Sequence, residues 1–194
     1  YVRNADGSIK MEDGRQVYDA NQTNFKRPNT VGNAVRDNVY DRNTTYGDLF
    51  TGNWAVNVTP LKGLKLTAKL GVTTNNSRRN HLYSVFGSAS GTDGGVSVRS
   101  DRESSYNNQY LANYVTDFNG QDRHHLDVLA GYEQYRTKFQ YQYGYNSYLY
   151  SPTVGELGNA NGTGDSKSLD SYTADYMTEG FLARAQYDFE ERYV

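Results

Sequence analysis

The chain of 194 residues contains no cysteine and a single isoleucine, Ile9. Without cysteine, disulfide bonds cannot stabilise the fold. Lys and Arg number 20 against 22 Asp and Glu, giving a net charge of −2. This balance lacks the basic surplus expected of a nucleic-acid-binding protein. No apolar run approaches the roughly 18 residues of a transmembrane helix, and the polar first residues do not resemble a signal peptide.

Aromatic side chains supply much of the limited apolar content. Hydrophobic residues make up only 36% of the chain, whereas aromatic residues make up 14% and include 19 tyrosines. Low hydrophobicity can indicate disorder, but disordered chains are poor in aromatic residues. Aromatic side chains suit the pleated surface of a sheet. The composition therefore favours β-structure.

Strict alternation of apolar and polar residues is clearest over residues 64–73. Leucine, alanine and valine hold the even positions, and lysine, threonine and glycine hold the odd ones. Because successive side chains of a strand point to opposite faces, this pattern predicts a strand with one aliphatic face. Similar alternation predicts strands over 46–59, from Val96 and most firmly from Tyr106 to Phe118, and again over 181–189.

The run from His124 to Tyr145 predicts a longer strand whose apolar parity changes near Gly131–Tyr135. Even positions carry Leu126, Val128, Ala130 and Tyr132, and odd positions then carry Tyr135, Phe139, Tyr141, Tyr143 and Tyr145. A β-bulge would reconcile the two halves. Alternatively, the outer half stands above a membrane, where neither face need be apolar.

The connections between these strands alternate in length. Short turns are predicted near 60–63, 119–123 and 190–192, and long loops over 76–95 and 146–171. Short periplasmic turns opposite long extracellular loops are typical of outer-membrane barrels. The pattern predicts an all-β, antiparallel up-and-down meander that forms part of a large transmembrane β-barrel. A soluble secreted or surface β-sandwich, or another outer-membrane barrel, is the alternative.

The barrel reading assigns the two strand faces to different surroundings. The aliphatic and aromatic stripe is predicted to face lipid, and the polar stripe to face the lumen. The lipid-facing candidates are Trp54, Val56, Val58, Leu64, Leu66, Leu70, Val72, Phe181 and Tyr187. The lumen-facing candidates are Lys65, Thr67, Lys69, Arg184 and Gln186.

No catalytic constellation, metal site or cofactor motif is expected in this sequence, so an enzyme is not predicted. Adjacent His124 and His125 would point to opposite faces of a strand and could not easily share a metal ion. Tyr83, Phe86, Tyr148 and Tyr150 lie in the predicted long loops. These aromatic residues are candidates for stacking on a sugar or peptide, or they pack the loops against one another and the barrel rim.

Four segments in order resemble the SusC/RagA family of TonB-dependent outer-membrane transporters. Residues 52–67 resemble a barrel hairpin of that family, and residues 127–133 resemble its LLGYE-like strand. Residues 149–160 resemble the loop that follows, and residues 180–193 resemble a further hairpin. The order and spacing agree over roughly residues 46–194.

The resemblance implies a role in importing glycans or peptides across the outer membrane of a Gram-negative bacterium. Family members are barrels of about 22 strands filled by a plug domain. A SusD-like surface lipoprotein and TonB are the implied partners, and TonB would not contact this segment. We expect residues 1–45 to form a polar loop region with a possible short hairpin. Residues 46–194 should form barrel strands of a longer protein, with the plug absent from this sequence.

Overall fold

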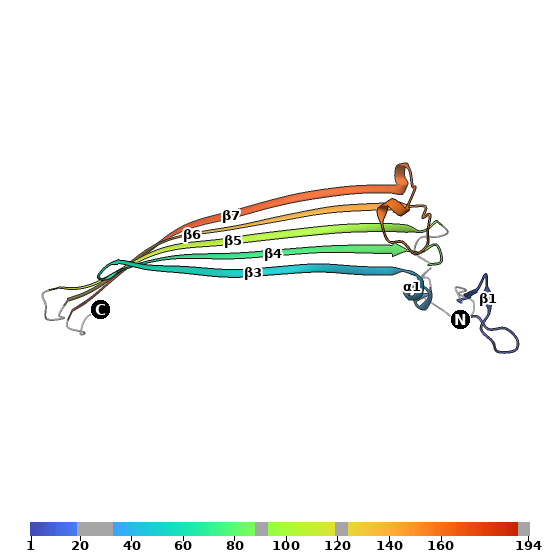
Figure 1. Ribbon diagram of the computed structural model, residues 1–194, viewed down its shortest axis with the longest axis horizontal. Coiled ribbons are helices and arrows are strands. Elements are labelled where there is room, and N and C mark those ends of the chain that lie inside the picture. The colour runs from blue at the N-terminus through green and yellow to red at the C-terminus, as the bar shows by residue number, and fades with distance from the viewer. Residues whose placement is uncertain (19–32, 88–92, 119–123, 190–194) are drawn as a thin grey trace. The chain divides into compact units, whose positions relative to one another are not determined.

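Five long strands dominate the computed structural model, which describes residues 1–18, 33–87, 93–118 and 124–189. They are β3 (Arg42–Leu61), β4 (Leu64–Tyr83), β5 (Gly95–Phe118), β6 (His124–Ser147) and β7 (Lys167–Phe189). Each strand pairs with the next along the chain in one antiparallel sheet of order β3-β4-β5-β6-β7, as Figure 1 shows. The predicted all-β meander is therefore confirmed.

The shorter elements precede β3 or follow β6. Strands β1 (Met11–Glu12) and β2 (Arg15–Gln16) pair around Asp13 and Gly14, whose positive φ angles of 49° and 76° suit a tight two-residue turn. Helix α1 spans Ala34–Tyr40, and η1 (Leu157–Asn159) and η2 (Gly164–Ser166) are single 3-10 turns. None of the helices in the described ranges is long and apolar enough to cross a membrane.

Helix α1 lies where the sequence predicted loop. The side-chain oxygen of Asn33 accepts hydrogen bonds from the backbone N–H groups of Val35 at 3.1 Å and Arg36 at 3.3 Å. These bonds satisfy backbone donors at the start of the helix that would otherwise lack partners. The capping residue was one of many asparagines in a polar segment, and the sequence pattern gave no apolar period to mark the helix.

The strand boundaries differ from the predicted ones mainly at the long loops. Strand β4 continues to Tyr83, so residues 76–83 are strand and not loop. The connections are then 84–94 and 148–166, both shorter than predicted. The turn after β3 is confirmed at Lys62–Gly63, where Gly63 has a φ of 83°. The predicted turns at 119–123 and 190–192 lie outside the described residues.

The chain divides into two units, and all five long strands contribute to both. Unit 1 comprises residues 1–46, 78–100 and 142–171, and unit 2 comprises residues 47–77, 101–141 and 172–194. Unit 1 holds the buried apolar side chains Leu82 and Val96. In unit 2 the described residues all lie in the five long strands or in the short turn between β3 and β4, so the two faces of the sheet organise that unit.

Candidate functional site

The even-numbered side chains of β3 and β4 in unit 2 form an exposed apolar face. Trp54 is 52% exposed, and Leu66 and Leu70 are each 40% exposed. Val56 and Val58 are exposed as well, whereas Leu64 and Val72 are half-buried. A β-sandwich would bury this stripe beneath a second sheet. The exposure shows that no such layer covers it among the described residues.

Aromatic contacts continue this face across β5, β6 and β7. The rings of Tyr110 and Tyr132 stack with their centroids 6.3 Å apart, and Tyr132 lies 5.1 Å from Phe181. Phe181 is 86% exposed. Nearer the turn end of unit 2, Tyr187 stacks on His124 at 5.9 Å. The structure thus brings Phe181 and Tyr187 onto one aromatic surface.

The opposite face of unit 2 carries polar side chains that bond to one another. Thr67 donates a hydrogen bond from Oγ1 to Asn57 Oδ1 at 2.8 Å. Asp127 accepts from Asn113 Nδ2 at 2.6 Å and from Arg184 Nη2 at 2.8 Å. A shallow hollow on this face is lined by Asn57, Lys65, Thr67, Lys69, Leu111, Asn113 and Leu129. The predicted lumen-facing residues of β4, Lys65, Thr67 and Lys69, therefore share one surface. Arg184 of β7 belongs to the same surface because it bonds to Asp127. Gln186, two residues further along β7, is exposed to solvent.

Gly131 lies on the polar face beneath two leucine side chains. A Cβ atom placed on this glycine would lie 2.6 Å from Leu111 Cδ2 and 3.0 Å from Leu182 Cγ. Any larger residue would have to displace these side chains. The glycine therefore leaves room for the side chains of Leu111 and Leu182 over the backbone of β6.

The register of β5 and β6 does not change at the position where a bulge was considered. Contacts join Tyr110 to Tyr132, Asn108 to Gln134, and Ser105 to Thr137. From the first of these pairs to the last, both strands advance by the same number of residues. Neither strand therefore contains the extra residue that a β-bulge would insert. The apolar stripe simply ends near Tyr132, and the same face becomes polar beyond it.

The two adjacent histidines point to opposite faces, as predicted. His124 Nδ1 lies 2.5 Å from Tyr187 Oη on the aromatic face, and His125 Nδ1 lies 2.7 Å from Asp117 Oδ1 on the polar face. No group of three or more His, Cys, Asp or Glu side chains suited to a metal ion occurs in the part of the chain that the structure describes.

In unit 1 the loop 148–166 is held by a network of asparagine side chains. Asn146 donates to the carbonyl of Ala160 at 2.8 Å and accepts from the Gly162 N–H at 3.0 Å. Asn159 donates to the carbonyls of Ser151 at 2.7 Å and Val154 at 2.8 Å. These amides add to the backbone pairing of the two loop arms, where Leu149 and Ala160 form an antiparallel bridge, so the loop has a defined conformation without long strands of its own.

The same loop is tied to the even-numbered side of β4. Arg78 Nη2 donates to Glu156 Oε2 at 2.8 Å, and Asn80 Nδ2 donates to the carbonyl of Gly155 at 3.1 Å. Tyr150, 71% exposed, and the exposed Tyr148 belong to this loop. The structure therefore leaves both loop tyrosines accessible to solvent.

Tyr83 and Phe86, the other two candidate substrate-contact residues, make contacts with different residues from those around Tyr148 and Tyr150. Tyr83 stacks on His81 with ring centroids 3.9 Å apart and lies 6.3 Å from Tyr145. Phe86 packs 5.6 Å from Tyr40, and the guanidinium of Arg15 lies 3.6 Å above its ring. The sequence analysis did not predict Tyr145 as a partner of Tyr83. The pairing arises because Gly95 has no side chain: a Cβ there would lie 2.7 Å from Tyr145 Oη.

Two titratable groups of unit 1 meet near the start of β3. Asp41 accepts a hydrogen bond from the backbone N–H of Ser84 at 2.8 Å, yet partial burial raises the pKa of its carboxyl. Partial burial lowers the pKa of His81, against the opposing influence of Asp41. Both shifts favour the neutral form because water is partly removed from the charged one.

The described residues thus define an amphipathic antiparallel meander with one exposed apolar face and one polar face. Its fold is similar to that of two solved structures, the RagAB peptide transporter and the RagAB peptide importer in the open-open state, with TM-scores of 0.70 and 0.69. A third, the importer in the closed-closed state, has a TM-score of 0.70.

Each of these three similarities covers 79% of this chain at 23% sequence identity. The chain spans 17% of the length of each matched chain. No protein-family model and no curated protein sequence matches the chain. The similarity therefore shows a shared fold with part of the RagAB transporter.

Proposed function

We propose that this chain is a segment of the wall of a TonB-dependent outer-membrane importer of peptides or glycans. The observation that carries the proposal is the exposed apolar face of unit 2, which includes Leu66, Leu70 and Phe181. A soluble protein rarely exposes so continuous an apolar surface. In a membrane, lipid hydrocarbon would cover this apolar face. The polar face with Lys65 and Lys69 would line the water-filled interior of a barrel.

The strand pairing supports a larger sheet. Among the described residues, β3 pairs only with β4, and β7 pairs only with β6. Long unpaired edges cannot stand in a bilayer because their N–H and C=O groups would lack partners. In the proposed barrel, further strands of the same protein pair with both edges and close the wall.

The role of this segment is scaffolding and not catalysis. The similar RagAB protein is a peptide transporter, which favours peptides over glycans as the cargo of the proposed importer. A SusD-like surface lipoprotein and TonB are the proposed partners, with TonB engaging another part of the protein. Tyr83 and the exposed Tyr148 and Tyr150 are candidate substrate contacts, whereas Phe86 is engaged by Arg15 and Tyr40.

Membrane fractionation tests the proposal. The whole protein that carries this chain, expressed in its Gram-negative host, should sediment with the outer membrane, resist extraction by alkaline carbonate and dissolve only in detergent. A secreted β-domain would instead remain soluble without detergent. Recovery in the soluble periplasmic or secreted fraction would overturn the proposal.

A further inference from the structure

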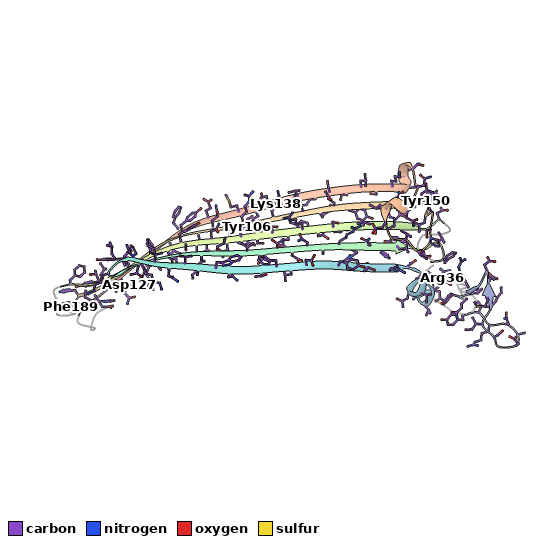
Figure 2. The ribbon with its side chains drawn as sticks, viewed as in Figure 1. Arg36, Tyr106, Asp127, Lys138, Tyr150 and Phe189 are labelled. Atoms are coloured by element: carbon purple, nitrogen blue, oxygen red, sulfur yellow. The ribbon has the colours of Figure 1, made fainter. Side chains whose placement is uncertain are left out.

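Three basic residues gather on β5 and β6 of unit 2. Arg102, Arg136 and Lys138 line one shallow hollow together with Ser104, Tyr106 and Gln140. All three cationic side chains are exposed to solvent. Figure 2 labels Tyr106 on β5 and Lys138 on the neighbouring strand β6. The hollow therefore offers positive charge beside hydroxyl and amide groups.

This basic hollow lies on the same side of the sheet as the apolar face. The side chains of β6 that line it have even numbers, as does Tyr132 in the aromatic row, and the register is unbroken between them. Arg136 follows Tyr132 by four residues, which corresponds to about 13 Å along a strand. Because barrel strands tilt by about 35–45°, this separation on β6 is about 10 Å along the membrane normal, which places the positive charge at the outer edge of the headgroup layer.

The negative charges on this face compensate only part of the cluster. Asp175 accepts two hydrogen bonds from Arg136, at 3.0 Å from Nε and at 2.5 Å from Nη2. Glu179 is engaged by Gln134 Nε2 at 2.9 Å. Arg102 and Lys138 form no ion pair or hydrogen bond with a side chain in the described ranges. Asp175 also attracts Lys138 electrostatically, but the hydrogen-bond donors of Lys138 and Arg102 remain available to an anionic ligand, and Asp175 holds Arg136 in place.

We propose that this hollow binds the phosphate of a lipid headgroup in the outer leaflet. The inference rests on the proposed function, because it needs the apolar face to lie in hydrocarbon. Acyl chains would then cover Tyr110, Tyr132 and Phe181, and the attached headgroup would reach Arg102 and Lys138. Charge-assisted hydrogen bonds from Arg and Lys are the strong interactions that proteins use for phosphate, and Ser104 and Gln140 can bond to neighbouring headgroup oxygens.

Native mass spectrometry of the detergent-purified whole protein tests the site with phosphatidic acid as the probe. Each basic residue near a membrane surface contributes a roughly fivefold preference for anionic lipid. The double variant Arg102→Gln/Lys138→Gln should therefore bind phosphatidic acid roughly 30-fold more weakly. The double variant Lys65→Gln/Lys69→Gln, which removes the same charge from the polar face, should bind it as the unmodified protein does.

The same experiment distinguishes the possible failures. Equal retention of phosphatidic acid by both double variants would overturn the lipid site while leaving membrane fractionation, and hence the proposed function, unaffected. Displacement by millimolar inorganic phosphate would show a site for the free anion, which also overturns the proposal. If the first double variant fails to assemble, Arg102→Gln should lose lipid and Arg102→Lys should keep it; equal binding by these two would count against the site.

Discussion

Leu66 and Lys69 illustrate how individual residues of β4 divide between the two faces. Leu66 belongs to the exposed apolar stripe, and Lys69 lines the hollow on the polar face with Thr67 and Asn113. Only three positions separate them, but strand geometry turns their side chains in opposite directions. Their tolerance of substitution should differ accordingly.

We predict that Leu66→Arg or Leu70→Arg impairs assembly of the whole protein into the outer membrane. A charged arginine in the middle of the bilayer costs about 2–4 kcal/mol. Lys69→Thr on the polar face should have little effect. The amount of heat-modifiable, folded barrel on unboiled gels measures the difference, and equal losses for Leu66→Arg and Lys69→Thr would contradict the assignment of the faces.

Asp41 and His81 form the residue pair whose charge should respond to pH. Because burial lowers the pKa of His81 below its usual value near 6.5, the folded state favours the neutral ring. Its contribution to stability is then present above about pH 6.5 and is lost as pH falls through the lowered pKa. Asp41, which raises the pKa of His81, limits this effect.

Titration by NMR of the histidine-labelled protein in micelles should place the pKa of His81 below that of an exposed histidine. Asp41→Asn should lower it further, because the carboxylate that favours the imidazolium is removed. Asp37→Asn, which removes an equal charge in helix α1, is the matched control. A higher pKa for His81 in Asp41→Asn would exclude the proposed contribution of Asp41.

At the scale of elements, the loop 148–166 depends on a close fit to the strand that precedes it. Leu157 packs against Gly144 of β6, where an added Cβ would lie 2.7 Å from Leu157 Cδ1. Gly158, in the same loop, has open space around the position of a Cβ. The two glycines therefore make a matched pair.

We predict that Gly144→Ala loosens this loop and Gly158→Ala does not. Forcing a methyl group into a packed contact typically costs about 1–3 kcal/mol. Limited proteolysis should cut the 148–166 loop faster in Gly144→Ala than in the unmodified protein. Equal cleavage of the two variants would show that Leu157 moves aside without cost.

Strand prediction succeeded where one face was apolar and failed where neither was. The alternation over 64–73 located β4, but the polar composition of residues 76–83 predicts a loop where the strand continues to Tyr83. The reason is that those residues form strand through backbone pairing, which is indifferent to side-chain polarity. The same reason explains why the β5–β6 register continues beyond Tyr132 without a bulge.

The candidate loop residues were partly recognisable from sequence. Aromatic composition singled out Tyr83, Tyr148 and Tyr150, but no local signal connected Tyr83 with Tyr145, more than sixty positions away. That contact requires Gly95 on the strand between them to leave space for a ring. A glycine's role in such a contact cannot be inferred until the strands are paired.

At the scale of the whole molecule, five strands paired in chain order make a sheet with different chemistry on its two faces. The wall function that we propose follows from this difference and not from any single residue. It also explains the composition: a barrel wall needs only one apolar side chain in two, so a chain that is 36% hydrophobic suffices.

The sequence by itself determined the all-β class, the strands of unit 2 and the division of their residues between an apolar and a polar face. It could do so because the alternation of side chains between two faces is a local property of a strand. Tertiary structure decided which side chains meet: Tyr83 with Tyr145, Asp127 with Arg184, and Arg102 with Lys138 in one hollow. These meetings depend on the register between strands. Register depends on turn geometry and on matching the faces of neighbouring strands, so the alternation within one strand does not specify it.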